Sequence, residues 1–238
     1  MSATKNPVIS NRLLAALPKQ SYQSLQRHLE DIPLNLEEIL YQPDQVITDV
    51  YFPNSGIVSL LAAVSERATL EVGLVGNEGM VGLAVFMGVN TSQNRAVVQS
   101  TGSAMRMKAT TFRKECNNGG DLQRLLQRYS HSLLTQVTQS AVCNQFHSVE
   151  ARLARWLLMT HDRTNDDQLQ LTQKFLSNML GVRREGVTRA AGALQKRKLI
   201  EYSRGRMRVL DRAGLEAISC GCYEIIQAES SGSVRGRT

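Results

Sequence analysis

The stretch LTQKFLSNMLGVRREGVTRAAGALQKRKLIEYSRGRMRVLD, residues 171–211, decides the interpretation of this chain. Its apolar spacing predicts two short helices separated by a turn at Gly181, followed by a two-stranded hairpin. Residues 171–212 contain eleven Lys and Arg against three acidic residues, a net charge of +8, whereas the whole 238-residue chain carries +7. A near-neutral body with one concentrated basic module is typical of a nucleic-acid-binding protein.

The two predicted helices have apolar faces that can pack against each other. The first helix follows Thr172, whose hydroxyl suits the N-cap position, and Gly181 suits a left-handed C-cap. The inward positions are expected to be Phe175, Leu176 and Met179 in the first helix and Val187, Ala190, Ala191 and Leu194 in the second. Such a helix-turn-helix arrangement leaves the opposite face of the second helix exposed.

That exposed face carries side chains suited to reading base pairs. Arg184, Glu185 and Arg189 fall within about 140° around a helix axis. An arginine can donate to guanine O6 and N7, while a glutamate accepts from cytosine N4. DNA phosphates would repel a carboxylate on this helix unless the carboxylate accepted a hydrogen bond from a base. The presence of Glu185 therefore favours base readout. The alternative is a basic helix pair that merely presents a solvated surface.

The predicted hairpin pairs residues 199–202 with residues 207–210 and carries Ser203-Arg204-Gly205-Arg206 at its tip. Two arginines at the tip of a short hairpin suit a wing that touches phosphates. Because turn, helix, acid and wing occur together in this order, the DNA-binding interpretation is favoured over the solvated surface.

The N-terminal half of the chain has a different pattern of apolar and turn-forming residues. Residues 11–29 predict one or two short amphipathic helices interrupted at Pro18. From about Ile32 to Lys108, short apolar runs alternate with turn signals such as Pro53-Asn54-Ser55-Gly56. Strands at this spacing predict a small antiparallel barrel or sandwich.

Residues 121–160 contain neither proline nor glycine and predict a long helical segment, with a second helix starting near Val149. The first part carries an apolar stripe formed by Leu122, Leu126, Tyr129, Leu133 and Val137. This stripe could pack on the chain's own barrel or pair with a second copy. A helix this long projects beyond a small barrel, which favours a homodimer. A hydrophilic break is expected at residues 161–168, and the polar tail at 229–238 is expected to be disordered.

Composition and motifs argue against several other classes of protein. No apolar run approaches the roughly 18 residues of a membrane span, and the N-terminus lacks a signal-peptide core, so we expect a cytoplasmic protein without membrane contact. The cysteines are expected to be free thiols, because only Cys220 and Cys222 are close and no second ligand pair completes a metal site. We expect neither a bound cofactor nor enzymatic activity, because the sequence shows no nucleophile–base pair, P-loop or paired carboxylates.

In its order of elements the chain resembles the catabolite activator/fumarate-nitrate regulator, or Crp/Fnr, family of bacterial transcription regulators. The most specific match is VRREGVTR, residues 182–189, which is similar to the family's recognition helix. The resemblance implies an α+β chain with four parts. These are a sensory antiparallel β-barrel or jelly roll like a cyclic-nucleotide-binding domain (1–120), a dimerisation helix (121–148), a winged helix-turn-helix domain (149–220) and a C-terminal tail (221–238).

The resemblance also implies how DNA is read. Arg184 and Arg189 would contact guanines and Glu185 a cytosine, in half-sites similar to TGTGA. Contacts to the DNA backbone are expected from Thr172, Lys174, Arg183, Thr188, Arg204 and Arg206.

In the sensory half, family members that bind cyclic nucleotides carry a Gly-Glu pair and an Arg-Ser/Thr-Ala run. The matching effector-pocket positions here are Gly82, Leu83, Arg95 and Ala96, so the glutamate and the hydroxyl residue are both replaced. Each lost hydrogen bond costs about 1–3 kcal/mol, so an ordinary cyclic-AMP response is not expected and any effector is an unidentified small molecule. Arg95 is left as either a contact for an anionic ligand or a structural ion-pair residue. No cysteine precedes Cys116, so the N-terminal iron–sulfur ligands of the Fnr branch are absent.

The leading hypothesis is a homodimeric regulator that binds double-stranded DNA at a pseudo-palindrome, with RNA polymerase as a further expected partner. The alternative is a ligand sensor that acts mainly through a protein partner and has only loose DNA affinity. An enzyme is the third and weakest hypothesis.

Overall fold

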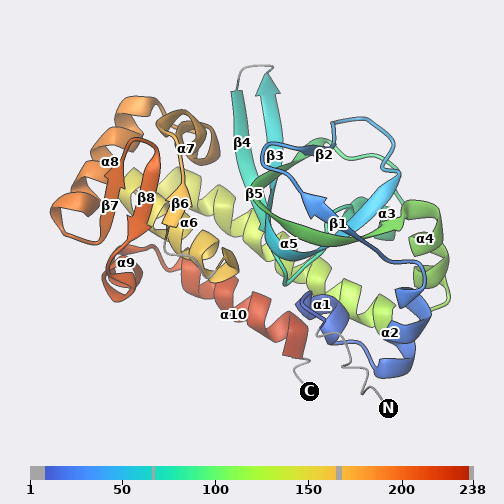
Figure 1. Cartoon of the computed structure of the whole chain (residues 1–238). Coiled ribbons are helices and arrows are strands. Elements are labelled where there is room, and N and C mark those ends of the chain that lie inside the picture. The colour runs from blue at the N-terminus through green and yellow to red at the C-terminus, as the bar shows by residue number, and fades with distance from the viewer. Residues whose placement is uncertain (1–8, 66–67, 165–167, 236–238) are drawn as a thin grey trace, which may run out of the picture.

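Figure 1 shows a sheet lobe and a helical lobe joined by one long helix, α5 (Asp121–Phe146). The computed structural model describes residues 9–65, 68–164 and 168–235. The sheet lobe contains α1 (Arg12–Ala15), α2 (Lys19–Gln26), β1 (Glu30–Leu34), β2 (Ile39–Tyr41), β3 (Asp49–Ser65), β4 (Ala68–Val75), α3 (Leu83–Phe86), β5 (Asn94–Lys108) and α4 (Ala109–Asn117). The helical lobe contains α6 (Val149–Thr164), β6 (Gln168–Gln170), α7 (Gln173–Leu180), α8 (Arg184–Lys196), β7 (Ile200–Ser203), β8 (Arg206–Val209), α9 (Arg212–Ile218) and α10 (Cys222–Arg235).

The five strands of the sheet lobe are antiparallel, in the order β1-β5-β3-β4, with β2 also paired to β5. β3 and β5 are long, and their register shifts three times between Pro53 and Val58. Such irregularities bend a strand pair and increase its twist. At this bend Gly102 is required, because a Cβ atom there would lie 2.2 Å from the carbonyl oxygen of Ser55. The mixed helix and antiparallel-sheet architecture predicted from the sequence is confirmed.

The N-terminal part of α5 covers this sheet. Leu122, Leu126 and Tyr129 are buried in the core of the sheet lobe, and Leu133 packs against the same core. Val137 is half-buried. The expectation that this stripe pairs two copies is therefore wrong for Leu122, Leu126 and Tyr129. The chain's own sheet already removes these three side chains from water, which was the alternative interpretation of the stripe.

The helical path breaks after α5. His147 has an extended backbone (φ −111°, ψ 148°), and α6 begins at Val149, as predicted. The predicted hydrophilic break at 161–168 is helical as far as Thr164, and residues 165–167 lie outside the described residues. α6 supplies the centre of the second core through Leu153, Trp156 and Leu157.

The C-terminal helix α10 packs along α5 (Figure 1). Tyr223 and Ile226 are buried, and His131 Nδ1 lies 3.4 Å from a carboxylate oxygen of Glu229. The expectation of a disordered tail is therefore corrected, because α10 is helical as far as Arg235. The buried side chains anchor the helix to the rest of the chain, and this packing outweighs the polar composition of its end. Residues 236–238 lie outside the described part.

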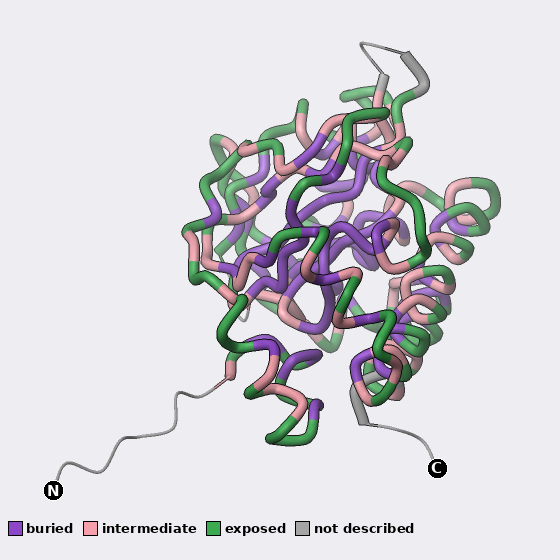
Figure 2. The backbone as a smooth tube through the Cα atoms, turned by 90° about the vertical axis from the view of Figure 1, so that its right-hand side faces the viewer, coloured by how far each residue is buried: buried purple, intermediate pink, exposed green. Residues whose placement is uncertain are grey.

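Figure 2 shows the buried residues gathered in the interior of the molecule, where they form a core in each lobe. The second core extends into the sheet, because Ile57, Leu61 and Leu74 pack with the helical lobe rather than with the first core. The helical lobe is thus seated on β3 and β4. None of the described helices is long and apolar enough to cross a membrane.

Candidate nucleic-acid interface

The α7–α8 pair forms as the sequence predicts. The hydroxyl of Thr172 accepts from the backbone N–H of Phe175 at 3.1 Å, which caps α7. Gly181 ends α7 with a left-handed backbone (φ 60°), and the N–H of Val182 donates to the carbonyl of Ser177 at 3.1 Å. This turn satisfies carbonyls at the end of α7 and lets α8 begin three residues later.

Gly181→Ala is expected to destabilise the protein by at least about 1–2 kcal/mol, the cost of a left-handed backbone for a residue with a side chain. A Cβ atom at Gly181 would also lie 2.7 Å from Leu70 Cδ1 on β4, so the contact between the lobes must shift. Urea unfolding measures this loss. Gly192→Ala is the control, because a Cβ atom at Gly192 in α8 meets nothing within 4 Å. Equal effects of the two substitutions would contradict the role of the turn.

α8 has one buried and one exposed face. Its buried face consists of Val187, Ala190, Ala191 and Leu194, all four as predicted. Arg184, Glu185 and Arg189 are exposed together on the other side. Within the described part of the chain, these three side chains have no hydrogen bond or ion pair, so they are available to a ligand. The hydroxyl of Thr188 donates to the carbonyl of Arg184 at 3.0 Å.

The hairpin of β7 and β8 lies beside the start of α7. Arg204 (φ 50°) and Gly205 (φ 76°) form a two-residue turn with positive φ at both positions, the geometry that matches strand twist. The N–H of Leu171 donates to the carbonyl of Gly205 at 2.7 Å, and the hydroxyl of Tyr202 donates to the carbonyl of Leu171 at 2.9 Å. These bonds fix the wing tip next to Thr172, with Arg204 and Arg206 exposed.

Three features of this module differ from the sequence interpretation. β6 adds a third strand to the wing through its pairing with β8, and a three-residue strand gives too short a pattern to predict. Arg212 is not on the basic surface, because it binds Asp162 at 2.7 Å and Glu216 at 3.0 Å. Arg197 similarly lies 3.7 Å from Glu150. The other predicted contacts on the backbone of DNA, Lys174 and Arg183, are exposed.

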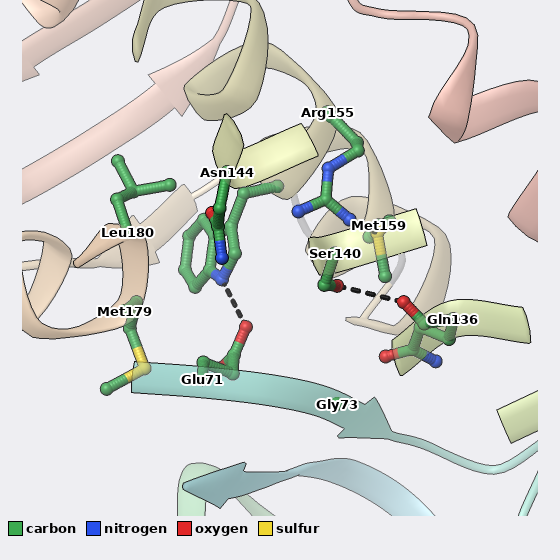
Figure 3. A pocket seen from close by; sticks show the side chains of 10 residues that line it. Glu71, Gly73, Gln136, Ser140, Asn144, Arg155, Met159, Met179 and Leu180 are labelled. Atoms are coloured by element: carbon green, nitrogen blue, oxygen red, sulfur yellow. Dashed lines mark hydrogen bonds between the residues drawn. The ribbon is translucent and has the colours of Figure 1, made fainter. Parts of the chain in front are cut away.

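A buried polar bridge joins this module to the sheet (Figure 3). The indole N–H of Trp156 on α6 donates to a carboxylate oxygen of Glu71 on β4 at 2.7 Å, and Ser59 donates to the other oxygen at 2.8 Å. Glu71 and Trp156 line a cavity of about 10 Å³ together with Arg155. This bridge was not predicted from the sequence. Its available signal was a lone acid inside the apolar run 70–75.

Glu71→Gln is expected to flatten the pH dependence of stability between about pH 4.5 and 7. Burial raises the pKa of Glu71 from 4.5 to about 7, opposed by hydrogen bonds from Ser59 and Trp156. In this window the unfolded chain releases the proton that the folded chain keeps, so stability falls as pH rises. A glutamine side chain keeps an acceptor for Trp156 and has no proton to release.

Urea unfolding midpoints measured across that window test this prediction. Glu30→Gln is the matched control, because Glu30 is exposed and should leave the wild-type slope unchanged. A slope that survives in Glu71→Gln would contradict the assignment of the raised pKa to Glu71.

Two of the predicted effector residues, Leu83 and Ala96, belong to the sheet-lobe core. Gly82 has a left-handed backbone (φ 94°) and is the N-cap of α3, Leu83 is buried, and Ala96 is fully buried in the same core. Arg95 Nε donates to Gln42 at 2.7 Å. Leu83 and Ala96, which the sequence resemblance matches to that carboxylate and that hydroxyl, are therefore both buried apolar residues.

Residues 151–218 match the Crp-like helix-turn-helix domain family. FixK2 from Bradyrhizobium japonicum has a similar fold (TM-score 0.69, 16% identity, 81% of this chain and 98% of that chain). So does CLP from Xanthomonas campestris, a c-di-GMP-responsive global regulator (TM-score 0.66, 18% identity, 81% and 99%).

A third similar structure is TTHB099 from Thermus thermophilus, a transcriptional regulator of the CRP family (TM-score 0.63, 17% identity, 79% and 96%). Comparison with curated protein sequences gives no match. The chain thus carries a Crp-like helix-turn-helix domain at residues 151–218 within the overall fold of Crp/Fnr-family transcription regulators.

Proposed function

We propose that this transcription regulator binds a pseudo-palindromic operator as a homodimer, with one α8 in the major groove at each half-site. The observation that carries the proposal is the exposed set of Arg184, Glu185 and Arg189 on a single face of α8. Their side chains are unengaged within the described residues, and their donors and acceptor match guanine and cytosine edges. The exposed Arg204 and Arg206 of the wing supply charge for the adjacent phosphates.

Arg184 and Arg189 are assigned to guanines and Glu185 to a cytosine. The positions assigned to the backbone of DNA are Thr172, Lys174, Arg183, Thr188, Arg204 and Arg206. Thr172 fits this role because its own N–H and the first turn of α7 lie beside the wing tip, where helix N-termini favour phosphate. Thr188 fits it less directly, since its hydroxyl already donates within α8.

Dimerisation is proposed along the part of α5 that faces away from the sheet. Leu134, Val142 and Phe146 are exposed there, at 63%, 39% and 75% of their surfaces. They fall within about 120° around the helix axis and form an apolar strip that differs from the stripe expected from the sequence. A second copy of α5 would cover this strip and hold the two α8 helices for half-sites about one helical turn apart.

Fluorescence anisotropy tests the function directly. The wild-type protein is titrated onto a duplex with two inverted TGTGA-like half-sites, onto a duplex with one half-site, and onto a scrambled duplex, at fixed salt. Tight binding to the inverted pair alone supports the proposal. Equal binding to all three duplexes would show only non-specific attraction to phosphates and would contradict base readout.

The same titrations are repeated with cyclic AMP. Because Leu83 and Ala96 are buried apolar residues at the matching positions, specific binding is expected to be the same with and without the nucleotide. Specific binding that requires cyclic AMP would contradict this interpretation of the sheet lobe.

A further inference from the structure

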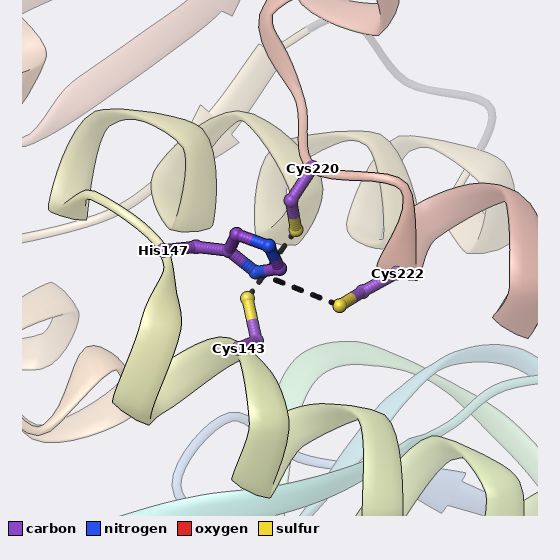
Figure 4. A group of neighbouring side chains, drawn as sticks. All are labelled: Cys143, His147, Cys220 and Cys222. Atoms are coloured by element: carbon purple, nitrogen blue, oxygen red, sulfur yellow. Dashed lines mark hydrogen bonds between the residues drawn. The ribbon is translucent and has the colours of Figure 1, made fainter.

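Three cysteines and one histidine meet where the two lobes join (Figure 4). Cys143 lies on the last turns of α5, and His147 follows the end of that helix. Cys220 lies in the link between α9 and α10, and Cys222 is the first residue of α10. The four possible ligand atoms all lie within 4.8 Å of one another, and the three cysteines are buried.

The spacing of these atoms fits one small metal ion. Zn–S bonds of about 2.3 Å and a Zn–N bond of about 2.0–2.1 Å place tetrahedral ligand atoms roughly 3.5–3.8 Å apart. In the structure, Cys143 Sγ lies 3.3 Å from Cys220 Sγ, and Cys222 Sγ lies 3.7 Å from His147 Nδ1. The first separation is too long for a disulfide, whose sulfur atoms are about 2.05 Å apart.

The ligand set and its surroundings also match a structural zinc site. Three cysteines with one histidine is an established structural zinc set. Zn²⁺ with three thiolates carries one negative charge, and two buried arginines, Arg152 and Arg155, lie close by. The charge of Arg155 acts on all three cysteines, and its Nε has no hydrogen-bond partner within the described chain.

We propose that Cys143, His147, Cys220 and Cys222 bind one Zn²⁺ ion in a tetrahedral site. The site ties the α9–α10 link to the break between α5 and α6, which is where the DNA-binding lobe leaves the long helix. Arg152 strengthens the same junction, because it donates to Asn144 at 2.6 Å and to the carbonyl of Leu180. Bound zinc therefore cross-links the α9–α10 link to the end of α5.

The expectation that all four cysteines are free thiols without a metal site is revised by this proposal. The sequence holds two half-sites, Cys143-x₃-His147 and Cys220-Gly221-Cys222, separated by about a third of the chain. The first half is an i, i+4 pair, whose side chains meet on one helix face. Only the return of α10 along α5 brings the second half to it.

Metal analysis of the full-length protein, purified under reducing conditions without chelator, tests the proposal. We expect about one zinc per chain, and Co²⁺ in its place should give the visible and thiolate charge-transfer bands of a tetrahedral sulfur-rich site. Cys220→Ser and Cys222→Ser should weaken zinc binding by at least about 100-fold, since changes outside the direct ligands already cost about 10–100-fold. Cys116→Ser is the matched control, because Cys116 is buried elsewhere in the sheet lobe and should leave zinc unchanged.

If a serine variant fails to fold, the wild-type protein still decides the question. Zinc is removed by a chelator and its return is followed by a competing colorimetric indicator, with circular dichroism as the check on folding. Three results would overturn the proposal: a reduced protein that takes up no zinc, iron with acid-labile sulfide in place of zinc, or a Cys143–Cys220 disulfide in protein isolated with its thiols trapped. Because metal is counted directly, these results do not depend on whether the operator is found.

Discussion

Arg184→Ala is expected to abolish most of the preference for the specific operator while leaving affinity for scrambled DNA nearly unchanged. A bidentate arginine–guanine contact contributes about 1–3 kcal/mol of discrimination. A homodimer makes the contact twice, so the expected loss on the full operator is about 2–6 kcal/mol. Arg184 is exposed and its side chain has no partner within the described residues, so truncating that side chain should not disturb the fold. Anisotropy titrations on the specific and scrambled duplexes measure the difference.

Arg206→Ala is the matched control for that experiment. Arg206 is also exposed, but it begins β8 beside the wing tip and is assigned to phosphate. Its loss should weaken binding to both duplexes about equally and lower the salt dependence of the affinity. If Arg184→Ala also lowered the affinity for both duplexes equally, the assignment of Arg184 to base readout would be contradicted.

Arg163→Met is expected to lower the free energy of unfolding by about 3–5 kcal/mol, the cost of leaving a buried charge without its partner. Arg163 on α6 contacts Glu78 through Nε at 2.9 Å and Nη2 at 2.8 Å. Only 7% and 9% of the two side chains are exposed. Glu78 also accepts from the backbone N–H of Gly76, so the ion pair fastens α6 to the loop after β4.

Two further variants identify the cause of this loss. Arg163→Met combined with Glu78→Gln should recover part of the stability, because no unpaired carboxylate is left in the interior. Arg106→Met removes an ion pair of similar length, 2.7 Å to Glu30, with 32% and 64% of the side chains exposed. That loss should be only about 0–1 kcal/mol. Similar losses for Arg163→Met and Arg106→Met, measured by urea unfolding, would show that burial does not set the strength of the Glu78 pair.

Local signals were sufficient for the DNA-binding module. The N-cap at Thr172, the left-handed turn at Gly181 and the tight turn at Arg204-Gly205 depend on the conformational preferences of a few adjacent residues. The inward face of α8 follows from helical periodicity, and the structure confirms all four predicted positions. The basic charge of the module is likewise a property of composition.

The apolar stripe on α5 shows what periodicity leaves open. The periodicity indicated that Leu122, Leu126 and Tyr129 are buried. Burial by the chain's own sheet and burial by a second copy give the same apolar spacing. The prediction of a disordered tail was wrong for a related reason. Contacts of Tyr223 and Ile226 with residues far away in sequence stabilise α10, and these contacts cannot be seen in the tail itself. In both cases the deciding contact lies outside the segment.

The sequence by itself determined the helix-turn-helix, its basic surface and the candidate base-reading side chains, because each depends on neighbours within a few residues. The tertiary structure alone decided which partner covers α5, how Glu71 and Trp156 join the lobes, and that Cys143, His147, Cys220 and Cys222 meet. These features depend on long-range packing between segments whose separation along the chain carries no local signal.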